Sequence, residues 1–199
     1  GRRVTGAAGR TSAARRAGAF DERGWLDPVR RVASPNADRR PPGVAVTLVV
    51  VHGISLPPGR FGGDAIERLF TNRLDPAAHP SFGDLAALRV SAHFLVRRDG
   101  SLVQFVGCDD RAWHAGASAW KGRERCNDYS IGIELEGTDV VPYTSRQYRR
   151  LATLLGRIAA RYPIADVVGH SDVAPGRKTD PGPSFDWTRL AGLPGRPAV

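Results

Sequence analysis

The chain has 199 residues, of which 41% are hydrophobic and 25% charged, as is typical of a globular protein with one domain-sized core. No apolar run approaches the ~20 residues of a membrane-spanning helix. Two cysteines, Cys108 and Cys126, are too few for a disulfide scaffold. The composition therefore excludes membrane-spanning and disulfide-rich classes.

The net charge of +9 is concentrated near the N-terminus, where residues 1–40 contain ten arginines and four acidic residues. Nucleic-acid binding would therefore depend on this segment, since a basic tail can bind phosphate without a fold. Its composition favours a solvated extension, and no nucleic-acid partner is expected. We predict a disordered Arg-rich leader over 1–20, one domain over 21–192 and a C-terminal tail over 193–199. The leader lacks the apolar block of a secretory signal, which predicts a cytoplasmic location.

A near-continuous run of apolar, β-branched residues over 44–51 predicts a central strand that is covered on both faces. His52 follows this strand, and a loop rich in Pro and Gly occupies 53–63. Asp64 predicts the start of a short helix, with Glu67 as its capping-box partner.

Two β-rich runs, 92–97 and 102–106, flank Asp99-Gly100, which is a strong tight-turn signal. They predict a hairpin. A further strand is predicted over 129–135, where apolar residues alternate with Gly and Glu.

A capping box of Thr144 and Gln147 predicts the start of a longer amphipathic helix, which Pro163 terminates. A short strand over 166–169 then leads directly to His170. Together these elements predict an α+β fold, a mixed β-sheet flanked by helices in a single domain.

Two histidines and one aspartate are candidate metal ligands. His52 and His170 each follow an apolar strand and precede a loop rich in Gly and Pro, and Asp180 lies in the second loop. Two His and one Asp leave a fourth position open on zinc, as hydrolytic zinc sites do. The spacing alone does not show that these residues converge. Structural histidines and an Asp-Pro-Gly turn are the alternative interpretation.

Charged residues near these candidates could take part in catalysis. Glu134 and Glu136 share one strand face, and a carboxylate among apolar neighbours can act as a general base. Lys178, one of two lysines in the chain, could stabilise an oxyanion. The alternatives are carboxylates at a solvent-facing strand edge and an ordinary surface lysine.

The segments 113–116 and 123–127 resemble a platform for sugar and peptide. Trp113 could stack on a sugar ring, and arginines such as Arg125 could bind a carboxylate with two parallel hydrogen bonds. Core packing is the alternative role for Trp113.

Five longer runs resemble the AmpD family, the zinc-dependent 1,6-anhydro-N-acetylmuramyl-L-alanine amidases of bacterial cell-wall recycling. The likeness extends over about residues 24–190. The runs are HGISLPPGRFGG (52–63), LRVSAHFLVRRDG (88–100), RAWHAG (111–116), GRERCNDYSIGIELEGTD (122–139) and GHSDVAPGRKTDPGPSFDW (169–187).

This resemblance implies an amidase fold and a role for each matching residue. The zinc ligands would be His52, His170 and Asp180. Glu134 would be the catalytic carboxylate, and Lys178 would stabilise the tetrahedral intermediate. Arg89, Trp113 and Arg125 would contact the substrate, an anhydro-muropeptide whose lactyl–L-Ala amide is hydrolysed. Gly53 departs from the family, which commonly has Asn there.

Three other functions remain as alternatives. Peptidoglycan recognition proteins share this fold, and some bind wall fragments without cleaving them. A secreted or phage-type amidase would cleave intact wall, and the leader could bind nucleic acid. The complete ligand set favours an enzyme over a binding module. We predict a monomeric zinc amidase with no membrane partner.

Overall fold

The computed structural model describes residues 18–197. A six-stranded mixed sheet forms its centre, in the order β12-β5-β11-β6-β7-β3. The strands are β1 (Ala19–Phe20), β2 (Leu26–Asp27), β3 (Arg30–Arg31), β4 (Ala37–Arg39), β5 (Leu48–Ile54), β6 (Phe94–Val96), β7 (Leu102–Gln104), β8 (Asp110–Ala112), β9 (Ala119–Trp120), β10 (Arg123–Glu124), β11 (Ser130–Glu136) and β12 (Asp166–Gly169). The α-helices are α1 (Ala65–Phe70), α2 (Ser145–Arg161) and α3 (His170–Val173), and the 3-10 helices are η1 (Pro80–Phe82), η2 (Leu85–Ala87), η3 (Cys126–Tyr129) and η4 (Trp187–Leu190).

Four neighbouring strands, β12, β5, β11 and β6, run parallel, and β7 pairs with β6 in the antiparallel direction. The predicted α+β fold with a mixed sheet and flanking helices is therefore confirmed. The predicted hairpin is β6–β7, and β12 has the predicted bounds.

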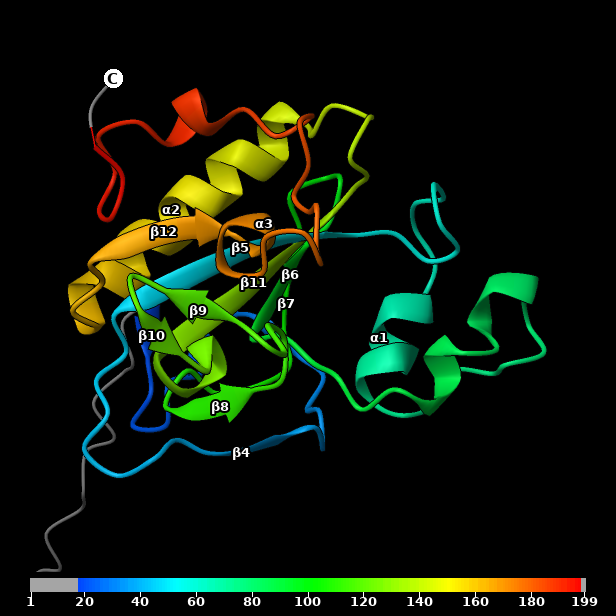
Figure 1. Ribbon diagram of the computed structural model, residues 1–199, viewed down its shortest axis with the longest axis horizontal. Coiled ribbons are helices and arrows are strands. Elements are labelled where there is room, and N and C mark those ends of the chain that lie inside the picture. Colours follow the sequence, from blue (N-terminus) through cyan, green and yellow to red (C-terminus); the bar gives the residue numbers. More distant parts are fainter. Residues whose placement is uncertain (1–17, 198–199) are drawn as a thin grey trace, which may run out of the picture.

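Helix α2 lies along one face of the sheet (Figure 1). Its Thr144–Gln147 capping box is present, as predicted, and its apolar stripe packs on the sheet. The core on this face includes Val49, Val51, Ile131, Ile133, Leu151, Leu154, Leu155 and Ile158. Alternation along β5 and β11 therefore turns His52 and Glu134 toward the opposite face.

One predicted boundary and one predicted helix cap near the site are wrong. The strand predicted over 44–51 is β5, which covers Leu48–Ile54, so His52 lies inside the strand. The strand continues beyond His52 because it pairs with β11 there: Glu134 lies opposite His52, and Glu136 lies opposite Ile54. Helix α1 begins at Ala65, but Asp64 makes no side-chain cap, so the predicted capping box is absent.

The predicted leader falls mostly outside the described residues, and its last two residues form β1, which pairs with β2. The predicted tail contacts the domain, because the carbonyl of Gly195 accepts a hydrogen bond from the Val167 N–H. The domain limits stay a prediction. Both Cys108 and Cys126 are buried free thiols. Within residues 18–197, the structure holds no helix with the length and apolarity that a bilayer span requires.

Candidate active site

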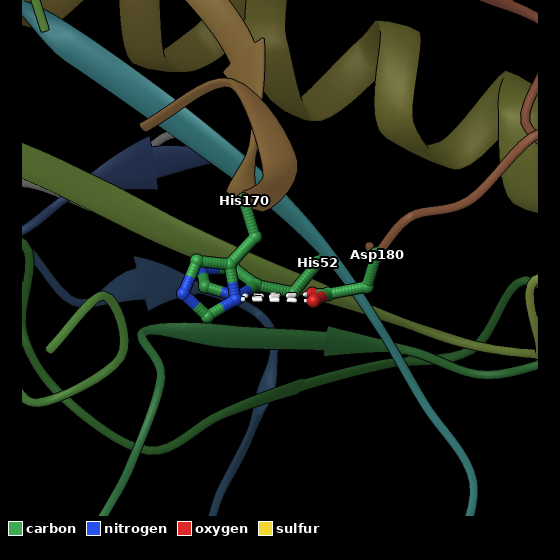
Figure 2. A group of neighbouring side chains, drawn as sticks. All are labelled: His52, His170 and Asp180. Atoms are coloured by element: carbon green, nitrogen blue, oxygen red, sulfur yellow. Dashed lines mark hydrogen bonds and ion pairs between the residues drawn. The ribbon is translucent and has the colours of Figure 1, made fainter. Parts of the chain in front are cut away.

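Three side chains converge where the parallel strands β5 and β12 lie side by side. His52 projects from β5, His170 from the turn α3 that directly follows β12, and Asp180 from the loop after α3 (Figure 2). His52 Nδ1 and His170 Nδ1 are 3.0 Å apart, and Asp180 Oδ2 is 3.2 Å from His170 Nδ1. The backbone N–H of Gly53 donates to Asp180 Oδ2 at 3.3 Å and so ties the loop to β5.

The three groups can hold a metal ion. Their ligand atoms all lie within 4.8 Å of one another, with both histidines buried and Asp180 half-buried. Two imidazole nitrogens and one carboxylate oxygen match the donor set of hydrolytic zinc sites, which keep a fourth position open. The ligands proposed from the sequence therefore lie together in space.

Burial and hydrogen bonding set the protonation of His52 and Asp180. It lowers the pKa of His52 to about 4, which leaves the imidazole neutral and able to donate a lone pair. Burial alone would raise the pKa of Asp180, but hydrogen bonds with His170 and His52 outweigh it and hold this pKa below its usual value. A neutral imidazole and an ionised carboxylate are the forms that bind metal.

Glu134 lies opposite His52 in the β5–β11 pair, and its Oε1 is 3.8 Å from His52 Nδ1. Its other oxygen, Oε2, is buried and has no hydrogen-bond partner among the described residues. Burial, together with the charge of Asp180, raises the pKa of Glu134 well above its usual value, and Lys178 opposes this shift. The alternative of a solvent-facing edge strand is wrong, because β11 lies between β5 and β6.

Two adjoining cavities open at this cluster. The site cavity, of about 220 Å³, is lined by the three candidate ligands, Glu134 and Lys178, with Ile54, Leu69, Phe70 and Leu88 as apolar wall. The basic cavity, of about 210 Å³, is lined by Arg89, Arg177, Lys178, Asn127 and Trp113. Trp113 and Lys178 line both cavities, so one extended ligand could occupy them together.

The structure separates the predicted substrate-contacting residues. Arg89 and Trp113 line the basic cavity, and Trp113 is half-buried with its Nε1–H donating to Asp38. Arg125 lines neither cavity. It precedes η3, is exposed, and pairs with Asp128 at 3.2 Å.

Two further residues at the site were not singled out from the sequence. His114, predicted only as part of a platform segment, lies 2.8 Å from His52 Nε2 through its Nδ1. Arg177 lies in the basic cavity and donates to the carbonyl of Ala115. The RAWHAG and GRKTD motifs contain both residues, but no spacing rule distinguishes them from their neighbours.

Known proteins resemble this chain over most of its length. A family model described as N-acetylmuramoyl-L-alanine amidase matches residues 42–183. The chain is 58% identical over 174 residues to the 1,6-anhydro-N-acetylmuramyl-L-alanine amidase AmpD of Citrobacter freundii, covering 86% of this chain and 93% of the relative. It is 59% identical over 171 residues to AmpD of Escherichia coli strain K12, with 85% and 93% covered.

Solved structures show the same similarity. The crystal structure of a selenomethionine AmpD derivative aligns with a TM-score of 0.84 at 59% identity, covering 86% of this chain and 96% of the other. A complex of the amidase AmiD from E. coli with the substrate anhydro-N-acetylmuramic acid-L-Ala-D-gamma-Glu-L-Lys aligns with a TM-score of 0.55 at 30% identity, covering 89% and 66%. This chain belongs to the N-acetylmuramoyl-L-alanine amidase family and, within it, to the AmpD group that its motifs resemble.

Proposed function

We propose that this protein is a zinc-dependent amidase that hydrolyses the amide between the lactyl group of anhydro-muramic acid and the L-Ala of a stem peptide, in cell-wall recycling. The observation that carries the proposal is the convergence of His52, His170 and Asp180 beside Glu134, whose Oε2 has no hydrogen-bond partner among the described residues. The AmpD relatives are named for this reaction, and AmiD has been solved with an anhydro-muropeptide substrate.

The donor set fits zinc, which His52, His170 and Asp180 would hold. Bound zinc supplies Lewis acidity, which lowers the pKa of a water to about 7 and polarises a carbonyl. The unpartnered Oε2 of Glu134 supports a catalytic role, since a buried acceptor with no protein partner is suited to binding a water.

Glu134 acts as the general base and then as the general acid. It accepts a proton from the attacking water, and the water oxygen bonds to the lactyl carbonyl carbon. Glu134 returns the proton to the amide nitrogen as the C–N bond breaks, so the products are a muramic carboxylate and a free amine on L-Ala. A carboxyl with a raised pKa is suited to both steps.

Lys178 supplies positive charge where the oxyanion develops, since it lines both cavities. Arg89 and Arg177 offer guanidinium groups to the carboxylates of the peptide, and Trp113 offers a ring face to the sugar. Arg125 would contact only a part of the substrate that extends beyond the cavities. The cytoplasmic location and the monomeric state stay predictions, which fractionation and sedimentation would test.

Mass spectrometry of anhydro-muramyl tripeptide incubated with the purified protein tests the proposal. Each sample is stripped with a chelator, and half is reloaded with zinc. We expect free tripeptide and anhydro-muramic acid only from the reloaded half. Intact substrate in both halves would refute the proposal, and equal cleavage in both would refute its zinc dependence. Parallel incubations with non-anhydro muramyl tripeptide and intact peptidoglycan separate recycling from wall lysis.

A further inference from the structure

The imidazoles of His52 and His170 have outer partners on one short segment. Each directs Nδ1 toward the ligand cluster, which leaves Nε2 on the far side of the ring. His52 Nε2 lies 2.8 Å from His114 Nδ1, and His170 Nε2 lies 3.2 Å from the carbonyl of Ala115. Two consecutive residues therefore supply the outer hydrogen bonds of both candidate ligands.

When Nδ1 of His52 binds a metal, the hydrogen bond between His52 and His114 has only one possible donor and one possible acceptor. The proton of His52 must then lie on Nε2, which donates to Nδ1 of His114. The proton of His114 in turn lies on Nε2, 3.1 Å from the hydroxyl oxygen of Ser130. Every ring nitrogen in this chain of contacts then has a single role.

The fold makes room for the His114 ring. A Cβ at Gly132 would lie 2.5 Å from Cγ of His114, so this position in β11 cannot bear a side chain while the ring is in place. The backbone of the segment is also fixed, because Asn127 Oδ1 accepts the N–H groups of His114 and Ala115. A glycine inside a strand weakens the strand. The close approach of the His114 imidazole explains why β11 has a glycine at position 132.

His93, a neighbouring buried histidine, shows what a purely structural histidine looks like in this fold. Its Nδ1 accepts the backbone N–H of Gly132 at 3.0 Å, and its Nε2 donates to the carbonyl of Asp110 at 2.9 Å. Both ring nitrogens of His93 therefore bond to the backbone, and the side chain of Arg40 lies 3.4 Å from Nε2. Those of His114 serve two side chains, one of which is a candidate metal ligand.

We infer that His114 is a positioning residue of the metal site: it accepts the Nε2–H of His52 and thereby presents the Nδ1 lone pair to the ion, with Ser130 fixing the ring of His114. This inference depends on the proposed zinc site. Groups that orient metal ligands in this way typically contribute 10–100-fold to metal affinity.

Zinc affinity, measured by competition with a chromogenic chelator, tests the inference without measuring turnover. Wild type is compared with His114→Leu, which removes the acceptor, and with His114→Asn, whose Oδ1 can replace Nδ1 as acceptor. We expect a Kd about 10–100-fold weaker for His114→Leu and within a few-fold of wild type for His114→Asn. Unchanged affinity in His114→Leu, or an equal loss in both variants, would overturn the inference. Absence of zinc binding in wild type would instead refute the proposed function.

A smaller substitution and a measurement on the wild type test the inference if His114→Leu does not fold. Ser130→Ala removes one hydroxyl and should weaken zinc binding a few-fold, whereas Gly156→Ala, at a helix position with open space around it, should leave it unchanged. Nitrogen-15 NMR of the zinc-loaded wild type should show a scalar coupling between His52 Nε2 and His114 Nδ1 across the hydrogen bond. Absence of that coupling would contradict the assigned contact.

Discussion

Glu134 and Glu136 occupy the same face of β11, two residues apart, and both are buried, with 8% and 2% of their surfaces exposed. Glu136 accepts hydrogen bonds from Arg97 and from the backbone N–H groups of Gly62 and Arg98. Glu134 has one oxygen 3.8 Å from His52 Nδ1 and the other without a partner among the described residues. The position on the strand is equivalent, but the surroundings differ.

The difference in surroundings shows how a structural buried carboxylate can be told from a catalytic one. Glu136 holds the loop after β5 against the sheet, and its satisfied oxygens leave nothing for a ligand to bind. Glu134 keeps an unsatisfied acceptor in a cavity, which costs stability unless a substrate, water or ion uses it. These surroundings indicate a structural role for Glu136 and support the proposed catalytic role of Glu134.

The largest expected effect is on turnover in Glu134→Gln. This variant keeps all three candidate ligands but loses the base, so the rate of tripeptide release should fall about 10²–10⁴-fold. Zinc content, measured on the same sample, should remain at the wild-type level. Near-normal turnover would remove Glu134 from the mechanism.

Glu136→Ala should instead affect folding. It leaves Arg97 and two backbone N–H groups without their buried acceptor, and breaking such a pair costs about 3–5 kcal/mol in the free energy of unfolding. Urea denaturation measures this loss, and turnover per folded molecule should stay within a few-fold of wild type. A stable but inactive Glu136→Ala would reverse the roles of the two carboxylates.

The smallest expected effect is a pH-dependent gain in stability for metal-free Glu134→Gln. The pKa of Glu134 is higher in the folded protein than in the unfolded chain, so the folded wild type loses stability as the pH rises through this interval. Gln does not titrate. The variant should therefore match wild type near pH 4 and exceed it by about 1–3 kcal/mol at pH 8. Urea melts at several pH values check this, and a gain that is equal at every pH would contradict it.

Local patterns predict the elements that depend on local chemistry. The Thr144–Gln147 capping box and Pro163 mark the ends of α2, and the apolar run 166–169 coincides with β12. Patterns fail where another local or tertiary partner competes for the same side chain. The side chain of Asp64 pairs with Arg68, and Glu67 pairs with Arg30 instead of capping α1. The end of β5 depends on its pairing with β11, which the local sequence around β5 does not predict.

The site divides in the same way. Residue chemistry singles out His52, His170 and Asp180 as candidates, but only the family resemblance joins His52 to the other two, of which His170 lies 118 residues away in sequence. The placement of the His114 ring depends on the missing side chain at Gly132 and on the hydrogen bond to Asn127. The segments that carry these three residues meet only in the folded chain. No spacing within one segment encodes such a contact.

The parallel pairing of β5 with both β11 and β12 has a consequence for synthesis at the ribosome. His52 is synthesised before its strand neighbours and the other two candidate ligands, which lie at residues 130–180. The nascent protein therefore cannot assemble the three-ligand cluster until Asp180 has been synthesised. Metal capture by all three groups must therefore wait for Asp180, and a chain that stops short of Asp180 lacks one of the three donors.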